Sequence, residues 1–277
     1  MCLDRSMIRF DEQVVVVTGA AGGLGHAYAA AFGRRGATVV VHDAGVARDG
    51  TGLDPAAAES VADELRTTGV AAEARTEDLS TKDGCDTLVG GVLERHGRLD
   101  ALVHSAGIVR YGSITDTTED EWRRMLAVNV ESAWWLTRAV WPTMSARRYG
   151  RIVLTVSGYG LRAYDGSDVT AYGVGKAAQF GLMNGLAGEG AELGIRVNAI
   201  EPIAATRIFR RSTAPDELTA EAVAPAAVAL AARECPVSGV VLNAADGEFQ
   251  VQTYPPSERA PLSGQQDPAE EVLGLLG

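Results

Sequence analysis

The chain has 277 residues, of which 46% are hydrophobic and 22% charged, and its formal net charge is −11. This composition excludes a disordered, collagen-like or coiled-coil chain, and the acidic balance argues against nucleic acid as a partner. The three cysteines and four histidines lack the spacing of a disulfide framework or a zinc site, so no metal is expected. No apolar run approaches the roughly 20 residues of a membrane helix, and no targeting segment is evident, so we expect a cytoplasmic protein without a membrane partner.

Short runs of β-branched residues alternate with longer amphipathic runs along the chain. In chain order, the pattern predicts strands at 14–18, 38–42, 70–74, 99–104, 151–156, 195–200 and 239–243. Helices are predicted between them, at 23–35, 55–68, 81–95, 119–147 and 169–193. Apolar strands that alternate with helices indicate an α/β fold: a single Rossmann-type, doubly wound parallel sheet of about seven strands with helices on both faces. We expect one domain over 1–254 and a partly ordered C-terminal tail over 255–277.

The first predicted strand runs into a glycine-rich turn, Thr18-Gly19-Ala-Ala-Gly-Gly23-Leu24-Gly25, and then into a helix. Such a turn lets the backbone approach a phosphate closely, while the first N–H groups of the helix point at the anion. A tight strand–helix connection that binds nothing would look similar on its own. The position of the turn, after the first strand of an α/β pattern, favours a dinucleotide site.

Asp43 ends the second predicted strand, where an acidic side chain can accept hydrogen bonds from the hydroxyls of an adenosine ribose. The same carboxylate would repel a 2′-phosphate, and no lysine or arginine stands at positions 20, 21 or 44 to bind one. We therefore predict NAD as the cofactor in preference to NADP. Two alternatives remain: Asp43 is only a loop carboxylate, or Arg34 or Arg48 reaches the site and reverses the preference.

Tyr172 and Lys176 lie four residues apart on a predicted helix, so their side chains share one face. A free tyrosine has a pKa near 10 and is a poor base at neutral pH, but a neighbouring ammonium favours the phenolate and lowers that pKa. Such a pair could move a proton on and off a carbinol oxygen. Tyrosine and lysine occur at this spacing by chance on many helices, and it is the glycine turn in the same domain that makes the pattern specific.

The TGxxxGxG turn near the N-terminus and the YxxxK pair past the middle resemble the short-chain dehydrogenase/reductase family over about residues 8–250. The resemblance implies an NAD(P)-dependent enzyme acting on CH–OH groups, with Asn129, Ser157, Tyr172 and Lys176 as catalytic residues. In the family, the serine binds the reacting oxygen and the asparagine holds a water of the proton relay. The cofactor-binding residues implied in the same way are Thr18, Gly19, Gly23, Leu24, Gly25, Asp43, Asp78, Leu79, Ala106, Gly107, Tyr172, Lys176, Pro202 and Thr206.

One branch of the family is matched more narrowly, by Arg9-Phe10, the segment 23–28, the glycine loop after Asp43 and Tyr149-Gly-Arg-Ile-Val. This branch is the dehydrogenase unit of peroxisomal multifunctional enzyme type 2 with its bacterial relatives, and it implies NAD and a secondary alcohol on a thioester or a steroid-like ring. Two other interpretations stay open: an NAD(P)H-dependent ketoreductase of specialised metabolism, and a catalytically silent dinucleotide-binding regulator or scaffold. The presence of all four catalytic residues argues against the silent protein.

Three segments depart from the family pattern, and one of them, Glu201-Pro202-Ile203, lacks the usual glycine after the proline. The usual Asn-Asn-Ala-Gly after the fourth strand is His104-Ser105-Ala-Gly here, so His104 is either a proton relay or a packed core histidine. The segment from Ser157 to Tyr172 is slightly longer than usual, which predicts a bulge near 165–168 at the mouth of the substrate site.

Further expectations concern partners. Trp134 and Trp141 are seven residues apart on the long predicted helix and so share a face, which in the family packs against a second subunit. We expect a homodimer or homotetramer, with plain core packing as the alternative. The Phe-Arg-Arg segment at 209–211 could form a lid over a small-molecule alcohol or ketone, or simply be solvated.

Overall fold

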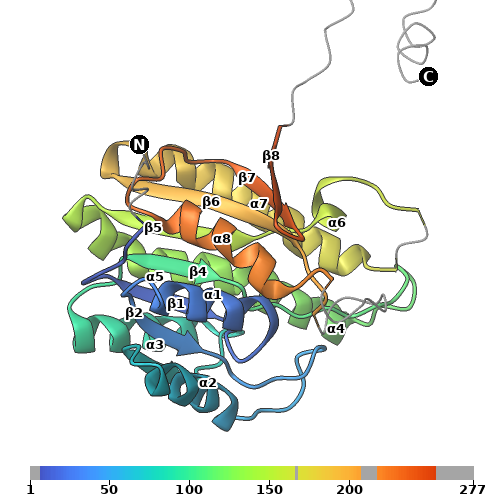
Figure 1. Cartoon of the computed structure of the whole chain (residues 1–277). Coiled ribbons are helices and arrows are strands. Elements are labelled where there is room, and N and C mark those ends of the chain that lie inside the picture. The colour runs from blue at the N-terminus through green and yellow to red at the C-terminus, as the bar shows by residue number, and fades with distance from the viewer. Residues whose placement is uncertain (1–6, 166–167, 207–216, 254–277) are drawn as a thin grey trace, which may run out of the picture.

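The computed structural model describes residues 7–165, 168–206 and 217–253. One eight-stranded sheet forms its centre, with the strand order β3-β2-β1-β4-β5-β6-β7-β8 (Figure 1). The strands are β1 (Val14–Thr18), β2 (Thr38–His42), β3 (Ala72–Arg75), β4 (Ala101–His104), β5 (Gly150–Thr155), β6 (Ile195–Ile203), β7 (Val241–Ala245) and β8 (Glu248–Gln252). The first seven pair in parallel, which confirms the predicted doubly wound α/β fold.

The prediction of about seven strands is corrected by β8, which pairs antiparallel with β7. A two-residue turn joins these strands, and both of its residues have positive φ: 47° at Asp246 and 79° at Gly247. Asp-Gly favours this hairpin turn, because both residues adopt the left-handed conformation easily. The sequence therefore carried a signal for β8, but the mostly polar strand lacked the apolar run that indicated the others.

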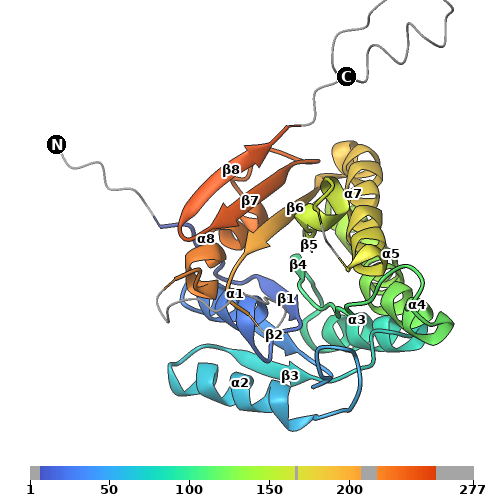
Figure 2. The ribbon, with the colours of Figure 1, turned by 90° about the vertical axis from the view of Figure 1, so that its right-hand side faces the viewer.

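Helices cover both faces of the sheet (Figure 2). One face carries α1 (Gly23–Gly33), α2 (Ala56–Thr67) and α8 (Ala220–Ala231), and the other carries α3 (Lys82–His96), α5 (Ser132–Arg147) and α7 (Thr170–Gly190). The strands alternate between these two layers: Val15 and Val17 of β1 pack toward the first, Val14 and Val16 toward the second. Because both layers are apolar, β1 is buried along its whole length.

The long helix predicted over 119–147 is interrupted in the structure. It consists of α4 (Glu119–Leu126), a π-helical turn (Ala127–Glu131) and α5. A π-turn inserts an extra residue into the helix and often occurs at functional sites. Here it carries Asn129, one of the predicted catalytic residues.

Two short elements precede and follow α7: the four-residue α6 (Gly158–Leu161) and a 3₁₀ turn (Ala191–Leu193). The predicted lid at 209–211 and the tail at 255–277 lie outside the described residues. Within the part of the chain that the structure describes, no helix is both long and apolar enough to cross a membrane.

Candidate active site

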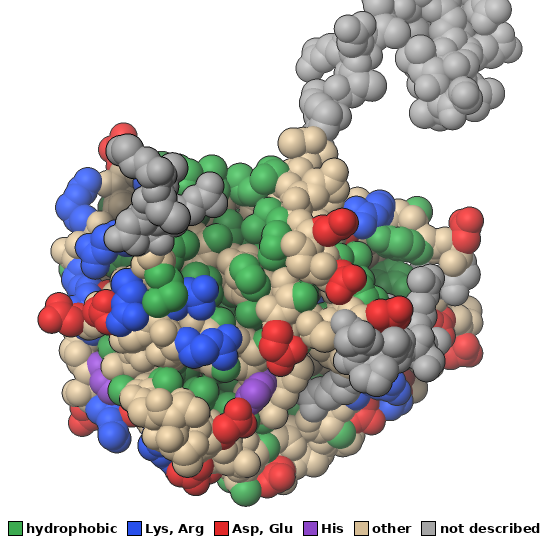
Figure 3. Space-filling model, viewed as in Figure 1, with side chains coloured by type: hydrophobic (Ala, Val, Ile, Leu, Met, Phe, Trp, Pro, Cys, Tyr) green, Lys and Arg blue, Asp and Glu red, His purple; other side chains and the backbone are tan. Residues whose placement is uncertain are grey.

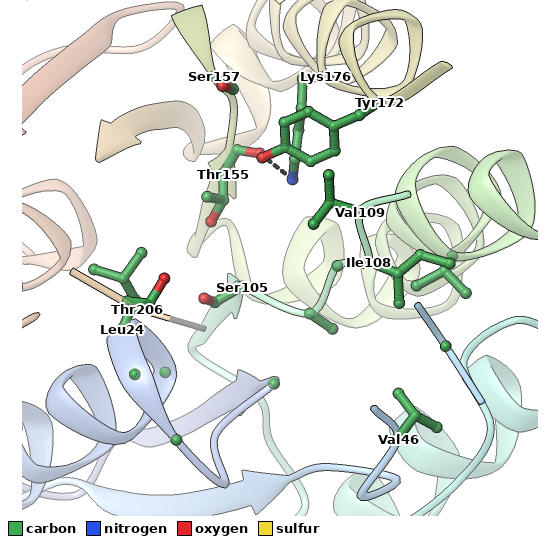
Figure 4. A pocket seen from close by; sticks show the side chains of 18 of the residues that line it. Leu24, Val46, Ser105, Ile108, Val109, Thr155, Ser157, Tyr172, Lys176 and Thr206 are labelled. Atoms are coloured by element: carbon green, nitrogen blue, oxygen red, sulfur yellow. Dashed lines mark hydrogen bonds between the residues drawn. The ribbon is translucent and has the colours of Figure 1, made fainter. Parts of the chain in front are cut away.

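A cleft of about 1700 Å³ opens at the carboxyl ends of the strands. Strand order reverses between β1 and β4, and α/β proteins bind ligands at such a switch point. Ser157, Tyr172 and Lys176 lie on one side of the cleft, and Leu24 and Thr206 lie on the other (Figure 4). The volume exceeds that of most single-ligand pockets, so a dinucleotide and a substrate fit side by side.

The glycine turn forms the floor of one half of the cleft. Gly19 has a φ of +68°, and a Cβ built there would lie 2.8 Å from the backbone of Ala106. A Cβ on Gly25 would collide with the carbonyl group of Gly19. Over Gly22, by contrast, nothing lies within 4 Å of a built Cβ. The turn is thus closely packed underneath and open above, as a phosphate cradle at the start of α1 requires.

Asp43 stands at the end of β2, buried beneath the cleft and only 7% exposed. One carboxylate oxygen accepts the Ala21 N–H at 2.9 Å, and the other accepts the Gly45 N–H at 2.8 Å. The side chain therefore fastens the glycine turn to the loop after β2. Arg48, which sequence reasoning named as a cation that could reach the site, lies 5.4 Å from the ring centroid of Tyr111.

The predicted pair on α7 faces the cleft as expected. Tyr172 and Lys176 are both buried, at 8% and 3% exposure, and the lysine Nζ lies 5.6 Å from the tyrosine ring centroid. Nζ donates a 2.8 Å hydrogen bond to the carbonyl oxygen of Thr155, the last residue of β5 (Figure 4). Among the described residues, no carboxylate forms an ion pair with this lysine.

The direction of the Tyr172 pKa differs from the expectation. Burial raises it to about 12, a hydrogen bond with Ser157 offsets part of the effect, and Lys176 is not among the groups that lower it. Burial lowers the pKa of Lys176 itself to about 8. Burial therefore sets the direction of the Tyr172 pKa in this structure, and the acidifying role of Lys176 stays a prediction. The phenol keeps its proton at neutral pH.

Asn129 of the π-turn is fully buried beside the pair. Its side chain accepts the Ile108 N–H at 3.1 Å and donates to the Ile108 carbonyl at 3.0 Å. Its own carbonyl accepts a 2.7 Å hydrogen bond from Gln179 of α7. The amide thus holds the strand exit after β4 in place next to Lys176. The water-holding role of Asn129 stays a prediction.

Comparison with known proteins agrees with this geometry. The family model for short chain dehydrogenases matches residues 13–218. The chain belongs to the short-chain dehydrogenase family. Its relatives include a short-chain type dehydrogenase/reductase of Mycobacterium tuberculosis, 38% identical over 86% of this chain and 84% of that one. The peroxisomal multifunctional enzyme type 2 of Mus musculus is 36% identical over 87% of this chain but only 33% of its own length.

Solved structures of the family superpose well on this chain. A short chain dehydrogenase from Mycobacterium avium has a TM-score of 0.81 at 34% identity and covers 96% of this chain and 94% of its own. Full-length peroxisomal multifunctional enzyme type 2 from Drosophila melanogaster has a TM-score of 0.76 at 28% identity, covering 97% of this chain and 45% of its own. The chain is thus an oxidoreductase that acts on CH–OH groups and uses a nicotinamide dinucleotide.

His104 is a buried structural residue in this short-chain dehydrogenase. It is 0% exposed, and its Nδ1 lies 2.9 Å from the hydroxyl of Thr18, its Nε2 3.0 Å from that of Ser132. The Ser132 hydroxyl donates to the Val128 carbonyl, so it accepts from Nε2–H, and the Thr18 hydroxyl then donates to Nδ1. Burial lowers the His104 pKa to about 3. A neutral ring with both nitrogens engaged joins β1 and β4 to the first residue of α5, which is a structural role and not that of a proton relay.

Most other predicted residues reach the same cleft. Thr18 does not line it, but its hydroxyl accepts the N–H of Ala106 at 3.1 Å and so joins β1 to the strand exit after β4. Thr206 lies against the glycine turn, since a Cβ built on Gly23 would be 3.1 Å from its methyl group. The remaining predicted cofactor residues that line the cleft are Gly19, Gly23, Leu24, Gly25, Asp78, Leu79, Ala106, Gly107 and Pro202.

The substrate side contains residues that sequence reasoning missed. Tyr111, Tyr159, Tyr164 and Glu201 all line the cleft. Asp165 and Asp168 line the cleft too, and the predicted bulge between them stays a prediction, because residues 166 and 167 lie outside the described residues. A signal existed in the concentration of tyrosines between 159 and 172, but their meeting with β6 depends on tertiary structure.

Proposed function

We propose that the protein interconverts a secondary alcohol and a ketone with NAD(H) as its cofactor. The observation that carries this proposal is the position of Ser157, Tyr172 and Lys176, which face the glycine turn across one cleft. A proton-transfer group and a dinucleotide cradle are thus within reach of one bound substrate. A regulator or scaffold without turnover would have no need of this arrangement.

The proton chemistry follows from the burial of the phenol. With a pKa of about 12, Tyr172 carries its proton at neutral pH and can donate it to a carbonyl oxygen that gains negative charge. Ser157 adds a second hydrogen bond to that oxygen. The ammonium form of Lys176, held by the Thr155 carbonyl, supplies positive potential behind the phenol. The nicotinamide, when bound, supplies the hydride to the carbonyl carbon or accepts it in the reverse direction.

Alcohol oxidation requires Tyr172 to be deprotonated first, because its phenolate takes the hydroxyl proton of the alcohol while hydride leaves for the nicotinamide. Since burial opposes the phenolate, we expect the oxidation rate to rise with pH above neutrality, while ketone reduction does not. Initial rates in both directions from pH 6 to 10 would test this. An oxidation rate that falls over this range would contradict the role of Tyr172.

The residues of the cradle fit a dinucleotide. Open space above Gly22 and the start of α1 suit a pyrophosphate, and the Asp43 carboxylate lies where an adenosine ribose is expected. Each Asp43 oxygen accepts one backbone N–H and keeps a further acceptor site for a ribose hydroxyl. A 2′-phosphate there would meet a buried negative charge. Fluorescence titration with NADH and NADPH tests the choice, and tighter binding of NADPH would overturn it.

The substrate is proposed only by class. The multifunctional peroxisomal relatives support a hydroxyacyl thioester as one candidate, and this chain aligns with about a third of the mouse enzyme. A small ring-bearing ketone is the other candidate. A panel with NAD(H), containing 3-hydroxyacyl thioesters, aryl ketones and aliphatic ketones, separates them through the nicotinamide absorbance. No absorbance change with any member would refute the proposed function.

We also propose that the enzyme is a homodimer or homotetramer through α5 and α7. Trp134 is 53% exposed and lines a shallow depression with Val130, Ala178 and Leu182. Trp141, on the same predicted face, is only partly exposed and packs against the core. The surface available to a second subunit is therefore smaller than the sequence indicated. Light scattering of Trp134→Glu beside the unmodified protein tests this, and an unchanged mass would exclude that face.

A further inference from the structure

An ion pair joins the substrate loop after β5 to the end of β6. Arg162, the residue after α6, donates from Nη2 to the Glu201 carboxylate at 2.7 Å and from Nε to the Tyr164 hydroxyl at 2.8 Å. The arginine is 45% exposed, but the Glu201 side chain is only 3% exposed. A buried carboxylate is costly unless it is paired, so Glu201 holds Arg162 more firmly than a surface partner would.

This cluster sits directly behind the predicted oxygen-binding serine. A Cβ built on Gly158, the residue after Ser157, would lie 2.8 Å from the Glu201 carboxylate and would collide with the Tyr164 hydroxyl. The pair therefore packs against the backbone that carries Ser157. The other Glu201 oxygen is buried without a hydrogen-bond partner among the described residues. This burial directs the glutamate toward Arg162 rather than toward water.

The same loop presents an aromatic wall. The ring centroids of Tyr164 and Tyr159 are 4.9 Å apart, and those of Tyr159 and Tyr172 are 6.5 Å apart. Tyr164 is 42% exposed and Tyr159 is 46% exposed, although both line the cleft. Exposed aromatic rings in a cleft are suited to the face or edge of a planar ligand ring. Of the three, Tyr164 is held by Arg162 and Tyr172 by its helix.

We propose that the Arg162–Glu201 ion pair is a specificity-determining, positioning element that holds the tyrosine wall beside Ser157. The wall then favours a carbonyl or carbinol carbon that bears a planar aromatic ring. Neither residue of the pair touches the reacting atoms. The proposal rests on the proposed alcohol–ketone activity and adds the class of substituent that this site selects.

The test compares two ketones of similar size, acetophenone with a planar ring and cyclohexyl methyl ketone with a puckered one. The protein is assayed with NADH as Arg162→Met, Arg162→Lys, Glu201→Gln and the Met/Gln double variant. Arg66→Met is the matched control, because Arg66 forms exposed ion pairs on α2 away from the cleft. Melting temperatures of all variants are recorded alongside.

We expect Arg162→Met to lower the preference for acetophenone, as the ratio of kcat/KM values, roughly three- to tenfold, mainly through a higher KM. The kcat for the cyclohexyl ketone should stay at its original value. Arg162→Lys, which keeps the charge near Glu201, should retain most of the preference. The double variant should be no worse than the worse single variant, because both changes remove one interaction.

The proposal would be overturned if Arg162→Met and Glu201→Gln left the ratio of kcat/KM values for the two ketones unchanged. An equal loss of kcat/KM for both ketones would overturn it as well. Calorimetric binding of the two ketones to the protein with NADH provides a readout independent of turnover. If neither ketone is reduced, the alcohol–ketone assignment is wrong for these substrates, while the binding preference still decides the role of the pair. Equal binding of both ketones to the unmodified protein would refute it.

Discussion

The two ends of the sheet bury ionisable groups in opposite ways. At the amino ends, Asp100 is fully buried and accepts hydrogen bonds from the Val14 N–H at 2.9 Å, from Arg98 at 2.7 Å and from Arg147 at 2.7 Å. Burial alone would raise its pKa, yet these donors together lower it. Basic side chains gather over this end on the left of Figure 3.

At the carboxyl ends, the shifts favour the neutral forms. Burial lowers the pKa of Lys176 to about 8 and that of His104 to about 3, and it raises that of Tyr172 to about 12. In the described residues, none of the three is matched by an opposite charge in an ion pair. Breaking a paired buried charge lowers stability, whereas the unpaired Tyr172 and Lys176, unlike the structural His104, remain available for proton transfer and binding. Four predictions test this contrast.

Tyr172→Phe should have the largest effect. Turnover should fall about 10²- to 10⁴-fold, because the substitution removes the hydroxyl group that exchanges the proton with the substrate. The free energy of unfolding should not fall, since the lost hydroxyl is buried at a cost. NADH affinity, measured by fluorescence, serves as the control and should be near normal. Unchanged turnover would show that Tyr172 takes no part in the mechanism. The carboxyl ends of the strands would then no longer differ from the amino ends in the way proposed.

Asp100→Asn should affect stability at the opposite end. We expect about 3 to 4 kcal/mol lower unfolding free energy in urea at pH 7, because a buried charge pair is broken. The folded pKa lies below the unfolded value of 3.8, so the carboxylate stabilises the fold above pH 4 and this contribution is lost as the pH falls below that value. The variant should therefore lose less stability than the unmodified protein on acidification.

The activity of folded Asp100→Asn protein distinguishes the two ends. Because the residue lies at the amino ends of the strands, kcat should match that of the unmodified protein below the melting temperature. A large loss of kcat without loss of stability would show that the two ends are not separate in role.

Lys176→Met should raise the free energy of unfolding at pH 7, whereas Asp100→Asn lowers it. Its folded pKa of about 8 lies below the unfolded value of 10.5, so burying the ammonium destabilises the fold below pH 8 and this penalty disappears as the pH rises to 10.5. Removing it should raise the unfolding free energy at pH 7 by about 2 kcal/mol, after allowing for the lost hydrogen bond to Thr155. Urea titrations at pH 7 and 10.5 measure the difference, and greater stabilisation at pH 10.5 would contradict it.

The sequence predicted the cofactor side of this site better than the substrate side. Gly19, Gly25 and Asp43 are specified locally, because a strand, a turn and a helix that follow one another fix their positions. Glu201 and Arg162 lie 39 residues apart, and only the placement of β6 beside β5 brings them together. No periodicity or spacing in the chain encodes such a contact.

Two further misses have physical causes. The π-turn at Asn129 was predicted as continuous helix, since its residues, Ala-Val-Asn-Val-Glu, contain neither glycine nor proline to mark a break. The raised pKa of Tyr172 was also missed, because spacing on a helix gives the distance between two groups but not their loss of water. The sequence thus predicted the position of Lys176 but not the pKa of Tyr172.

His104→Leu should have the smallest effect of the four. It compares a buried structural residue at the carboxyl ends of the strands with the proposed catalytic residues there. At pH 7 we expect about 1 to 2 kcal/mol lower stability, because Thr18 and Ser132 each lose one hydrogen bond but keep another partner. The folded pKa of about 3 lies below the unfolded 6.5, so the unmodified protein loses stability as the pH falls from 6.5 toward 3. Leucine has no proton to bind, so the deficit of the variant should shrink at pH 5. Urea titrations at the two pH values decide this. A constant deficit would mean that His104 binds a proton as readily in the folded state as in the unfolded state. A pH-rate profile that changed near pH 6.5 would restore His104 as a proton relay.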